Sequence, residues 1–368
     1  MLDDQLTKRI VQFLRSKLNH RGTESAFNCA IATSTGLVRD QNQDAALFIR
    51  ARYASTSEKD FDLAIVCDGL GGMKHGGEAS ILGLSTFVSS VVRFSHLPME
   101  DRLLVGMREA NDRIFQAFRG HGGTTLSAIA IGRNGSAAVC HVGDSRIYAI
   151  GDHYVRQLTH DDTLQGALQR GSSADQDGGQ RDTRLLQFVG MGSDLEAHLF
   201  RPISGEPKNY LLTSDGAHDI PVNYMQRVAY AARSNSDLAR KLIQLSEILG
   251  GFDNATAIAM PASIAEAADR PDDGIDLSLM SAFGHLAVWI PESMDKKRGA
   301  PSVGEASPAN EPLPSSEPPG SENPVDIGNN KRAKLPGSKK KKKAGPSDEL
   351  PLNEPLTIQF PAPDEGDR

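Results

Sequence analysis

The feature that most constrains the fold is a series of short apolar runs that contain β-branched residues. Runs of this length, bounded by turn residues, are typical of buried strands. They lie at residues 28–33, 45–50, 61–67, 126–131, 136–142, 146–150, 198–203 and 209–213. Longer segments, with an apolar residue at every third or fourth position, predict helices at 76–93, 99–119, 221–233 and 235–249. Strands that bracket a pair of helices indicate an α+β sandwich, because a parallel sheet needs strands and helices in alternation.

Composition allows a sizeable core and limits what fills it. The chain has 368 residues, of which 39% are hydrophobic and only 5% aromatic, so the core must be mostly aliphatic. Lys and Arg number 40 against 47 Asp and Glu, which gives a net charge of −7. A protein whose whole surface binds nucleic acid is therefore excluded as a first interpretation.

Aspartates stand where several of the apolar runs begin or end. Asp68 ends the run LAIVC, Asp144 follows AAVCHVG, Asp215 follows YLLTS and Asp253 precedes NATAIAM. If these runs are strands, the four carboxylates lie at one rim of a sheet. Neighbouring carboxylates raise one another's pKa, and a divalent cation resolves that conflict. Oxygen ligands without a His and Cys set favour Mg²⁺ or Mn²⁺ over zinc.

Seven ordered segments carry a resemblance to a known family. They are 39–44 (RDQNQD), 68–72 (DGLGG) with 77–80 (GEAS), 123–125 (GTT), 143–146 (GDSR), 158–159 (LT), 213–216 (TSDG) with Asp219, and 250–256 (GGFDNAT). In this order they resemble the motifs of the PPM-type, or phosphatase-2C-like, metal-dependent protein phosphatases in their bacterial form. The resemblance implies a four-layer αββα sandwich of two antiparallel sheets flanked by helix pairs, with metals in a cleft at one end.

The same resemblance implies a role for each matching residue around two Mn²⁺ or Mg²⁺ ions. Asp68 would bridge the two ions, and the Gly69 carbonyl would bind one of them. Asp215 and Asp253 would complete the second site, while Asp44 would act mainly through a coordinated water. Asp68 and Asp44 therefore count as catalytic.

A weaker third ion and the substrate phosphate are implied in the same way. Asp144, Asp219 and Asp215 would hold the third ion. Arg39 would be both catalytic and substrate-binding, as a bidentate donor to the phosphate. Two cations would lower the pKa of a shared water, so that hydroxide attacks the phosphomonoester without a covalent phosphoenzyme.

Three positions depart from the family pattern. Leu70 stands where many eukaryotic members have a candidate acid, His. Gln43 replaces a metal-facing Glu, and Asp162 replaces the usual final His of the LTxDH segment, so no catalytic role is assigned to Asp162. None of these changes removes a direct metal ligand.

The resemblance implies hydrolysis of phosphoserine and phosphothreonine on proteins, against a cognate Ser/Thr kinase. Hydrolysis of a small phosphoester would use the same site. The rival from another class is a binding or regulatory protein of low activity that keeps the fold and acts through its C-terminal region. Gln43, Asp162 and the long C-terminal region favour that rival, and the complete direct-ligand set opposes it.

Composition divides the chain into four parts. Residues 1–20 predict an amphipathic helix, and residues 21–262 form the catalytic domain, with a variable flap at about 163–197. Residues 263–300 are too apolar to leave in water, so they either fold back on the domain or dock a partner. Residues 301–368 hold 13 of the 20 prolines and are predicted to be disordered.

A basic run in the last part carries eight positive charges between Lys331 and Lys343. It is either a solvated linker or a contact for an acidic partner, nucleic acid or anionic lipid. No signal peptide or membrane-spanning segment is visible, which predicts a cytoplasmic protein. The three cysteines, Cys29, Cys67 and Cys140, lie in apolar runs and are expected to be buried free thiols; we expect a monomer.

Overall fold

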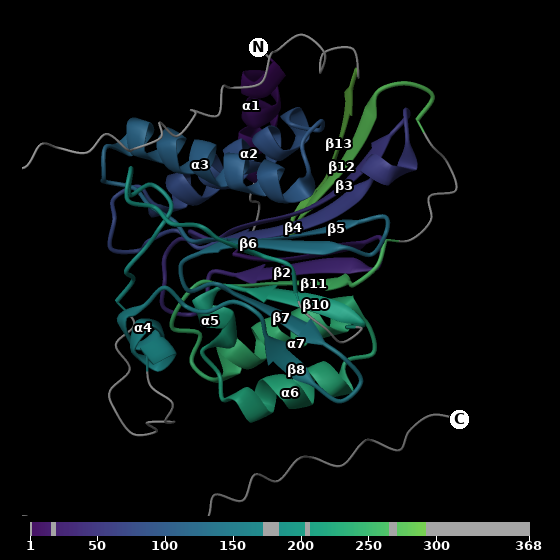
Figure 1. The fold of residues 1–368 in the computed structure, drawn as a ribbon. Coiled ribbons are helices and arrows are strands. Elements are labelled where there is room, and N and C mark those ends of the chain that lie inside the picture. The colour runs from purple at the N-terminus through teal and green to yellow at the C-terminus, as the bar shows by residue number, and fades with distance from the viewer. Residues whose placement is uncertain (1, 16–19, 172–183, 203–206, 265–270, 292–368) are drawn as a thin grey trace, which may run out of the picture. The chain divides into compact units, whose positions relative to one another are not determined.

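Two antiparallel β-sheets face each other in the computed structural model, which describes residues 2–15, 20–171, 184–202, 207–264 and 271–291 (Figure 1). Sheet A has the strand order β1-β2-β11-β10-β7-β8, with bounds Arg21–Ala26, Cys29–Ser34, Ala255–Pro261, Asn209–Thr213, Arg146–Ile150 and Val155–Gln157. Sheet B has the order β13-β12-β3-β4-β5-β6-β9, with bounds Gly284–Ile290, Ile275–Ser281, Ala45–Tyr53, Phe61–Cys67, Leu126–Gly132, Ala137–Val142 and His198–Phe200.

Helices cover the outer face of each sheet, which makes four layers (Figure 1). Those that pack on sheet B are α1 (Leu2–Arg15), α2 (Gly76–Arg93) and α3 (Met99–Phe118). Those that pack on sheet A are α5 (Asp215–His218), α6 (Val222–Ala231) and α7 (Asn235–Ile248). Two further short elements are the helix α4 (Leu164–Gly171) and a 3₁₀ turn at Ser57–Lys59.

Three apolar layers explain why the strands read as continuous hydrophobic runs. In β3, Leu47 and Ile49 face the helices α1–α3, whereas Phe48 between them faces sheet A. On the other sheet, Ile258 faces sheet B while Ala257 and Ala259 face α7. A strand that is buried on both faces cannot alternate apolar and polar residues, so its sequence stays apolar throughout.

The predicted α+β sandwich is confirmed, and each predicted strand run and helix contains the expected element. The sequence did not predict the two edge strands of sheet A, β1 and β8, or the short helices α4 and α5. Most residues of β1 are polar and partly exposed, so no apolar alternation marks that strand.

The segment 263–300, for which the sequence left two alternatives, contributes a hairpin in its described part. Strand β12 pairs with β3 along Ile275–Met280, and β13 forms the edge of sheet B. At the other end of the chain, α1 buries Leu6, Ile10 and Leu14 against α2 and sheet B. The basic run at 331–343 lies outside the described residues.

The three cysteines are free and buried, which confirms the prediction. Burial raises the pKa of the Cys140 thiol to about 12, and it raises the pKa of the Cys29 and Cys67 thiols as well. All three thiols are therefore chemically quiet. Within the described ranges, no helix has the length and apolar character needed to span a membrane.

Candidate metal centre

The ends of β3 and β4 bring two carboxylates together on sheet B. Ala45, which begins β3, pairs with Cys67, which ends β4. Asp44 and Asp68 are the residues just beyond this pair, so both lie at the same edge of the sheet. Asp44 is 2% exposed, whereas Asp68 is half-buried.

The equivalent edge of sheet A contributes three more carboxylates. Thr213 ends β10 and pairs with Arg146 of β7 and Ala257 of β11. Asp215 follows β10, whereas Asp144 and Asp253 precede β7 and β11. Because β10 runs antiparallel to both neighbours, its end and their beginnings meet, as predicted for Asp144, Asp215 and Asp253. The prediction that all four acids share one sheet is wrong for Asp68, which follows β4 of sheet B.

Two hydroxyl groups join these edges across the sandwich. Ser214 donates its Oγ–H to Asp44 Oδ2 at 2.8 Å, and Thr256 donates its Oγ1–H to the same oxygen at 2.6 Å. The Thr256 backbone N–H in turn donates to Ser214 Oγ at 2.9 Å. Asp44 of sheet B is thus tied to two strands of sheet A, which fixes the distance between the two groups of carboxylates.

The backbone of Asp68 is held on both sides by the GTT segment. Asp68 N donates to Thr125 Oγ1 at 2.9 Å, while Thr125 N and Thr124 Oγ1 both donate to Asp68 O at 2.8 Å. Thr125 Oγ1 also lies 2.7 Å from Ser145 Oγ, in the segment that carries Asp144. The GTT and GDSR segments therefore position the acidic residues, a role that was not predicted for these hydroxyl groups.

A glycine is required directly after Asp68. A Cβ at Gly69 would lie 2.4 Å from the Gly76 carbonyl oxygen and 2.8 Å from the Gln43 carbonyl oxygen, closer than real Cβ contacts allow. The chain turns here between β4 and α2, and this close backbone approach leaves no room for a side chain. The absence of a side chain at Gly69 therefore lets this turn approach the backbone of Gln43, in the loop before β3.

The carboxylates interact strongly with one another. Burial, and then the charges of Asp44, Asp215 and Asp144, raise the pKa of Asp68 well above its usual value. Burial and the charge of Asp253 raise the pKa of Asp215, and burial with the charge of Asp215 raises the pKa of Asp144 to about 7. Asp68 and Asp215 share a hydrogen bond, which requires a proton on one of the two.

This donor set fits hard divalent cations. Asp215 Oδ1 is buried and, among the described residues, has no hydrogen-bond partner, which is costly for a carboxylate oxygen unless a cation contacts it. Every candidate ligand atom is an oxygen, as Mg²⁺ and Mn²⁺ prefer. In the described ranges no three His, Cys, Asp or Glu side chains are already gathered as a metal-binding group. Ion binding would therefore involve a rearrangement of the Asp68–Asp215 hydrogen bond.

Arg39 lies against the same cluster. Its Nη2 donates to Asp253 Oδ2 at 2.7 Å, and the side chains are 47% and 35% exposed. The hydrogen bond and charge of Asp253, followed by the charges of Asp215 and Asp68, raise the pKa of Arg39. A Cβ at Gly71 would sit 3.3 Å from Arg39 Nη1, so the DGLGG turn leaves room for the guanidinium. Arg146 also lies close enough to act on Asp144, but it is paired with Asp161, so among the described residues Arg39 is the cation that directly contacts one of the five carboxylates.

Asp162 has a positioning role that the sequence did not reveal. It is 1% exposed, accepts a hydrogen bond from Gly143 N at 3.0 Å and contacts His198 Nε2 at 2.8 Å. Burial raises the pKa of Asp162, but the hydrogen bonds from His198 and the Gly143 N–H outweigh it, so the pKa lies below the usual value. Asp162 thus anchors the residue directly before Asp144.

The neighbouring Asp161 anchors Arg146, which lies two positions after Asp144. Arg146 donates Nε and Nη2 to the Asp161 carboxylate at 2.9 and 2.6 Å. The two aspartates of the LTHDD segment therefore hold the GDSR turn from both sides. Only the tertiary arrangement shows this, because 15 residues separate Arg146 from Asp161.

The remaining predicted residues lie near the cluster with weaker ties. Asp219 is exposed, and its N–H donates to Asp215 O at 2.7 Å, so the two aspartates lie at the two ends of α5. Gln43 is held by its backbone N–H, which donates to Asn254 Oδ1 at 2.7 Å. Asn254 also donates Nδ2 to Thr35 O and Gln41 O, both at 2.9 Å, and so fixes the loop that carries Arg39.

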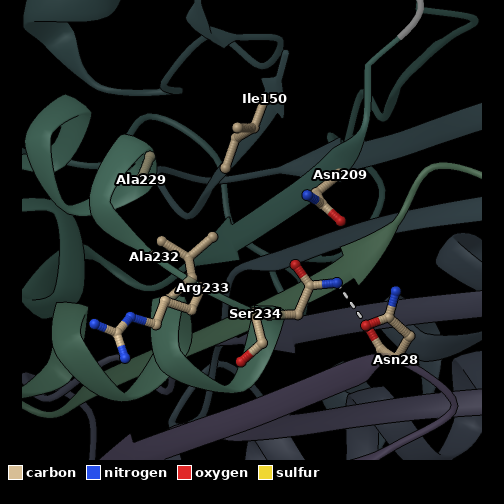
Figure 2. A pocket seen from close by; sticks show the side chains of 9 residues that line it. Asn28, Ile150, Asn209, Ala229, Ala232, Arg233 and Ser234 are labelled. Carbon is tan, nitrogen blue, oxygen red and sulfur yellow. Dashed lines mark hydrogen bonds between the residues drawn. The ribbon is translucent and has the colours of Figure 1, made fainter. Parts of the chain in front are cut away.

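A hollow of about 240 Å³ lies at the end of sheet A that is opposite to the carboxylates (Figure 2). Asn28, Ile150 and Asn209 line it at the ends of β2, β7 and β10 that are remote from the carboxylates. Asn235 Nδ2 donates to Asn28 O at 2.6 Å across its floor. None of its lining residues is a carboxylate, so its chemistry differs from that of the candidate metal centre.

The relatives of this chain in sequence are phosphatases of the kind that its motifs resemble. No family model matches the chain. It is 29% identical over 240 residues to a phosphatase 2C-type protein of Streptococcus pyogenes, covering 62% of this chain and 94% of the relative. It is 26% identical over 248 residues to the serine/threonine phosphatase stp of Listeria monocytogenes, covering 64% and 95%.

Solved structures show the same likeness. The PPM Ser-Thr phosphatase MsPP of Mycobacterium smegmatis, solved with cacodylate, aligns with a TM-score of 0.54 and 29% identity, over 65% of this chain and 99% of that one. Stp1 of Staphylococcus aureus aligns with a TM-score of 0.55 and 23% identity, over 68% and 100%, and shows the shared fold alone. Fold, motif order and relatives agree: in all three this chain is similar to the bacterial PPM-type Ser/Thr phosphatases.

Proposed function

We propose that this chain is a metal-dependent protein phosphatase that hydrolyses phosphoserine and phosphothreonine. The observation that carries the proposal is the meeting of five aspartates from two sheets, with Arg39 bound to one of them, Asp253. Such an excess of negative charge suits divalent cations, and Arg39 suits the phosphate that they would help to bind. The relatives named as serine/threonine phosphatases support the same reaction.

In this proposal the ions are held by the residues that the resemblance implied. Asp68 and the Gly69 carbonyl would contact two Mn²⁺ or Mg²⁺ ions, and Asp215 and Asp253 would complete the second site. Asp144, with Asp219 and Asp215, would hold a weaker third ion. When bound, the ions supply Lewis acidity that activates water near neutral pH.

Arg39 would bind and orient the phosphomonoester. Its guanidinium offers two parallel N–H groups to two phosphoryl oxygens, a geometry that lysine cannot supply. The Asp253 carboxylate now accepts one of these N–H groups, so it holds the guanidinium at the edge of the carboxylate cluster. A phosphate bound there would lie between Arg39 and the aspartates' ions.

Asp44 would act on the ions indirectly. Its Oδ2 already accepts two hydroxyl hydrogen bonds, from Ser214 and Thr256, which orient the carboxylate. We infer that it contacts the ions through a coordinated water. Ser214 and Thr256 then orient Asp44 and have no contact with substrate.

The substrate in the cell would be a phosphoprotein made by a Ser/Thr kinase, since a phosphatase of this class reverses such a kinase. A low-activity binding protein that acts through its C-terminal region is the alternative. The complete set of Asp68, Asp215 and Asp253 at one end of the sandwich favours the enzyme, because a binding protein has no need to retain mutually repelling carboxylates.

The test is hydrolysis of an aryl phosphate and of a phosphothreonine peptide with Mn²⁺, Mg²⁺ or EDTA. Turnover should require metal and should fall at least about a hundredfold in Asp68→Ala and in Asp215→Ala. Asp152→Ala is the matched control, since Asp152 is 61% exposed and pairs with Lys208 away from the cluster. A folded wild-type protein without turnover under any metal would favour the binding-protein alternative.

A further inference from the structure

An exposed apolar surface lies directly beside Arg39 and Asp253. We call it the apolar platform, and its members come from the β2–β3 loop and from the turn between α7 and β11. They are Leu37, Val38, Ile248, Leu249 and Phe252, which are 67%, 62%, 80%, 44% and 73% exposed. Single exposed apolar residues are common on protein surfaces, whereas a group of five in one place marks an interaction site.

Backbone contacts show that the two segments of the platform are continuous. Leu37 N donates to Gly251 O at 2.7 Å. A Cβ at Gly251 would lie 2.9 Å from Leu37 Cγ, and a Cβ at Gly250 would lie 2.3 Å from the Phe252 ring. The Leu37 side chain and the Phe252 ring therefore lie over successive glycines of one turn.

Folding does not explain the exposure of these side chains. Helix α7 buries Leu238, Leu242 and Ile243 in the layer beneath sheet A, but its last residue, Ile248, is the most exposed large apolar residue among those described. The turn that follows is fixed by backbone hydrogen bonds from Gly250 N to Glu247 O and from Gly251 N to Ser246 O. Its shape therefore depends on the glycines, and polar side chains at 248 or 252 would serve the fold equally well.

Position and charge indicate what the platform binds. Leu37 is two residues from Arg39, and Phe252 is directly before Asp253, which is hydrogen-bonded to Arg39. The platform members carry no charge, while the adjoining Arg39 is the cation that would receive a phosphate. A ligand that satisfies both surfaces has an anionic phosphoryl group flanked by apolar side chains.

We propose that the apolar platform binds apolar residues next to the phosphorylated residue of a protein substrate, and so selects among substrates. This inference rests on the proposed function. An extended chain advances about 3.3 Å per residue, so a side chain two or three positions from the phosphorylated residue lies about 7–10 Å away. We therefore expect the selected residues at those positions.

The test compares two phosphothreonine peptides that differ only in having Leu or Ser two and three positions from the phosphothreonine. The wild type should hydrolyse the Leu peptide with a kcat/KM about tenfold above that of the Ser peptide, the scale of one buried aliphatic side chain. In Phe252→Ser and in Leu37→Ser the ratio of the two kcat/KM values should fall toward one. Phe252→Leu should restore most of it, because only apolar contact is required.

Tyr230→Ser is the matched control, because Tyr230 is 49% exposed on α6 and outside the platform. It should keep the wild-type ratio. An unchanged ratio in Phe252→Ser and Leu37→Ser, with wild-type circular dichroism, would overturn the inference. So would a wild-type dimer that Phe252→Ser disrupts without a change in the ratio, since the platform would then cover a second copy. Failure of the wild type to hydrolyse even an aryl phosphate would instead count against the proposed function.

Discussion

The two ends of the β3–β4 pair use buried charge in opposite ways. At one end Asp44 and Asp68 face three further aspartates, and Arg39 is bound to one of these, Asp253. Toward the other end, Arg50 donates Nε and Nη2 to Asp62 at 3.0 and 2.6 Å, and Arg52 Nη1 donates to Asp62 at 3.2 Å. Asp60 lies 3.9 Å from Arg52 Nε, so this end has as many cations as anions.

The difference separates structural charge from functional charge. Arg50, Arg52, Asp60 and Asp62 balance one another's charges within the chain. At the other end, the negative charges of the aspartates are not balanced within the chain, and each aspartate raises the pKa of its neighbours. A positive charge from outside the chain must therefore balance them. The comparison therefore predicts opposite responses to mutation, to pH and to added cations.

The largest effect on stability should come from removing a carboxylate at the balanced end. In Asp62→Ala, two buried guanidinium groups lose their shared carboxylate, and the free energy of unfolding should fall by about 3–5 kcal/mol. Urea denaturation would measure the loss. At the unbalanced end, Asp68→Asn should raise the unfolding free energy of the protein in EDTA, because burial and the neighbouring carboxylates disfavour the ionised form of Asp68 and Asn cannot ionise. A comparable loss of stability in both variants would contradict the contrast.

The second-largest effect should be a pH dependence of stability that arises from the aspartates at the unbalanced end. The pKa of Asp144 is raised to about 7 in the folded protein, against about 3.9 in an unfolded chain. Between these values the folded state holds a proton that the unfolded state releases, so stability in EDTA should fall as pH rises from about 4 to 7. We expect a change on the order of 1–4 kcal/mol across this window.

Thermal unfolding in EDTA at several pH values would measure this slope, with Asp144→Asn as the reference. The slope should be shallower in Asp144→Asn, because Asn does not titrate. Saturating Mn²⁺ should weaken or reverse the slope in the wild type, since the ion replaces the protons. An identical slope in wild type and Asp144→Asn would show that Asp144 titrates at an ordinary pKa.

The smallest effect should follow from loosening the tie between the sheets. Ser214→Ala removes one of two hydroxyl hydrogen bonds to Asp44 Oδ2, at an expected cost of about 1 kcal/mol in stability. Because Asp44 would then be less well oriented, Mn²⁺ affinity should fall about tenfold. Calorimetric titration would detect this change. Ser136→Ala, at an exposed turn, is a control that should leave the affinity unaltered.

Sequence reasoning succeeded where one physical signal dominates. The apolar runs of β3, β4 and β10 are continuous because both faces are buried, and they mark the strands whose ends carry Asp44, Asp68 and Asp215. The motifs of the resemblance then predicted a role at the metal centre for each of these acids. The resemblance implied two antiparallel sheets, but the order of the strands within them was not predicted, because no local pattern encodes it.

Side chains that act through long-range contacts gave no such signal. Asp162 departs from the family pattern, so the sequence assigned it no role, yet it anchors Gly143 beside Asp144. Ser214 and Thr256 belong to recognised motifs, but only the structure shows that both donate hydrogen bonds to Asp44. The apolar platform was invisible for a similar reason, because Leu37 and Phe252 are 215 positions apart and meet only through the Gly251 turn.

The most direct test of the central claim is calorimetric titration of the wild type with Mn²⁺ at pH 6.5, in two buffers of different ionisation enthalpy. We predict saturable binding of at least two ions, with release of protons, because the pKa values of Asp68, Asp215 and Asp144 are raised before the ions bind. Binding should be lost in Asp68→Asn and retained in Asp152→Ala. Absence of binding by the folded wild type, or binding that survives Asp68→Asn unchanged, would contradict the account.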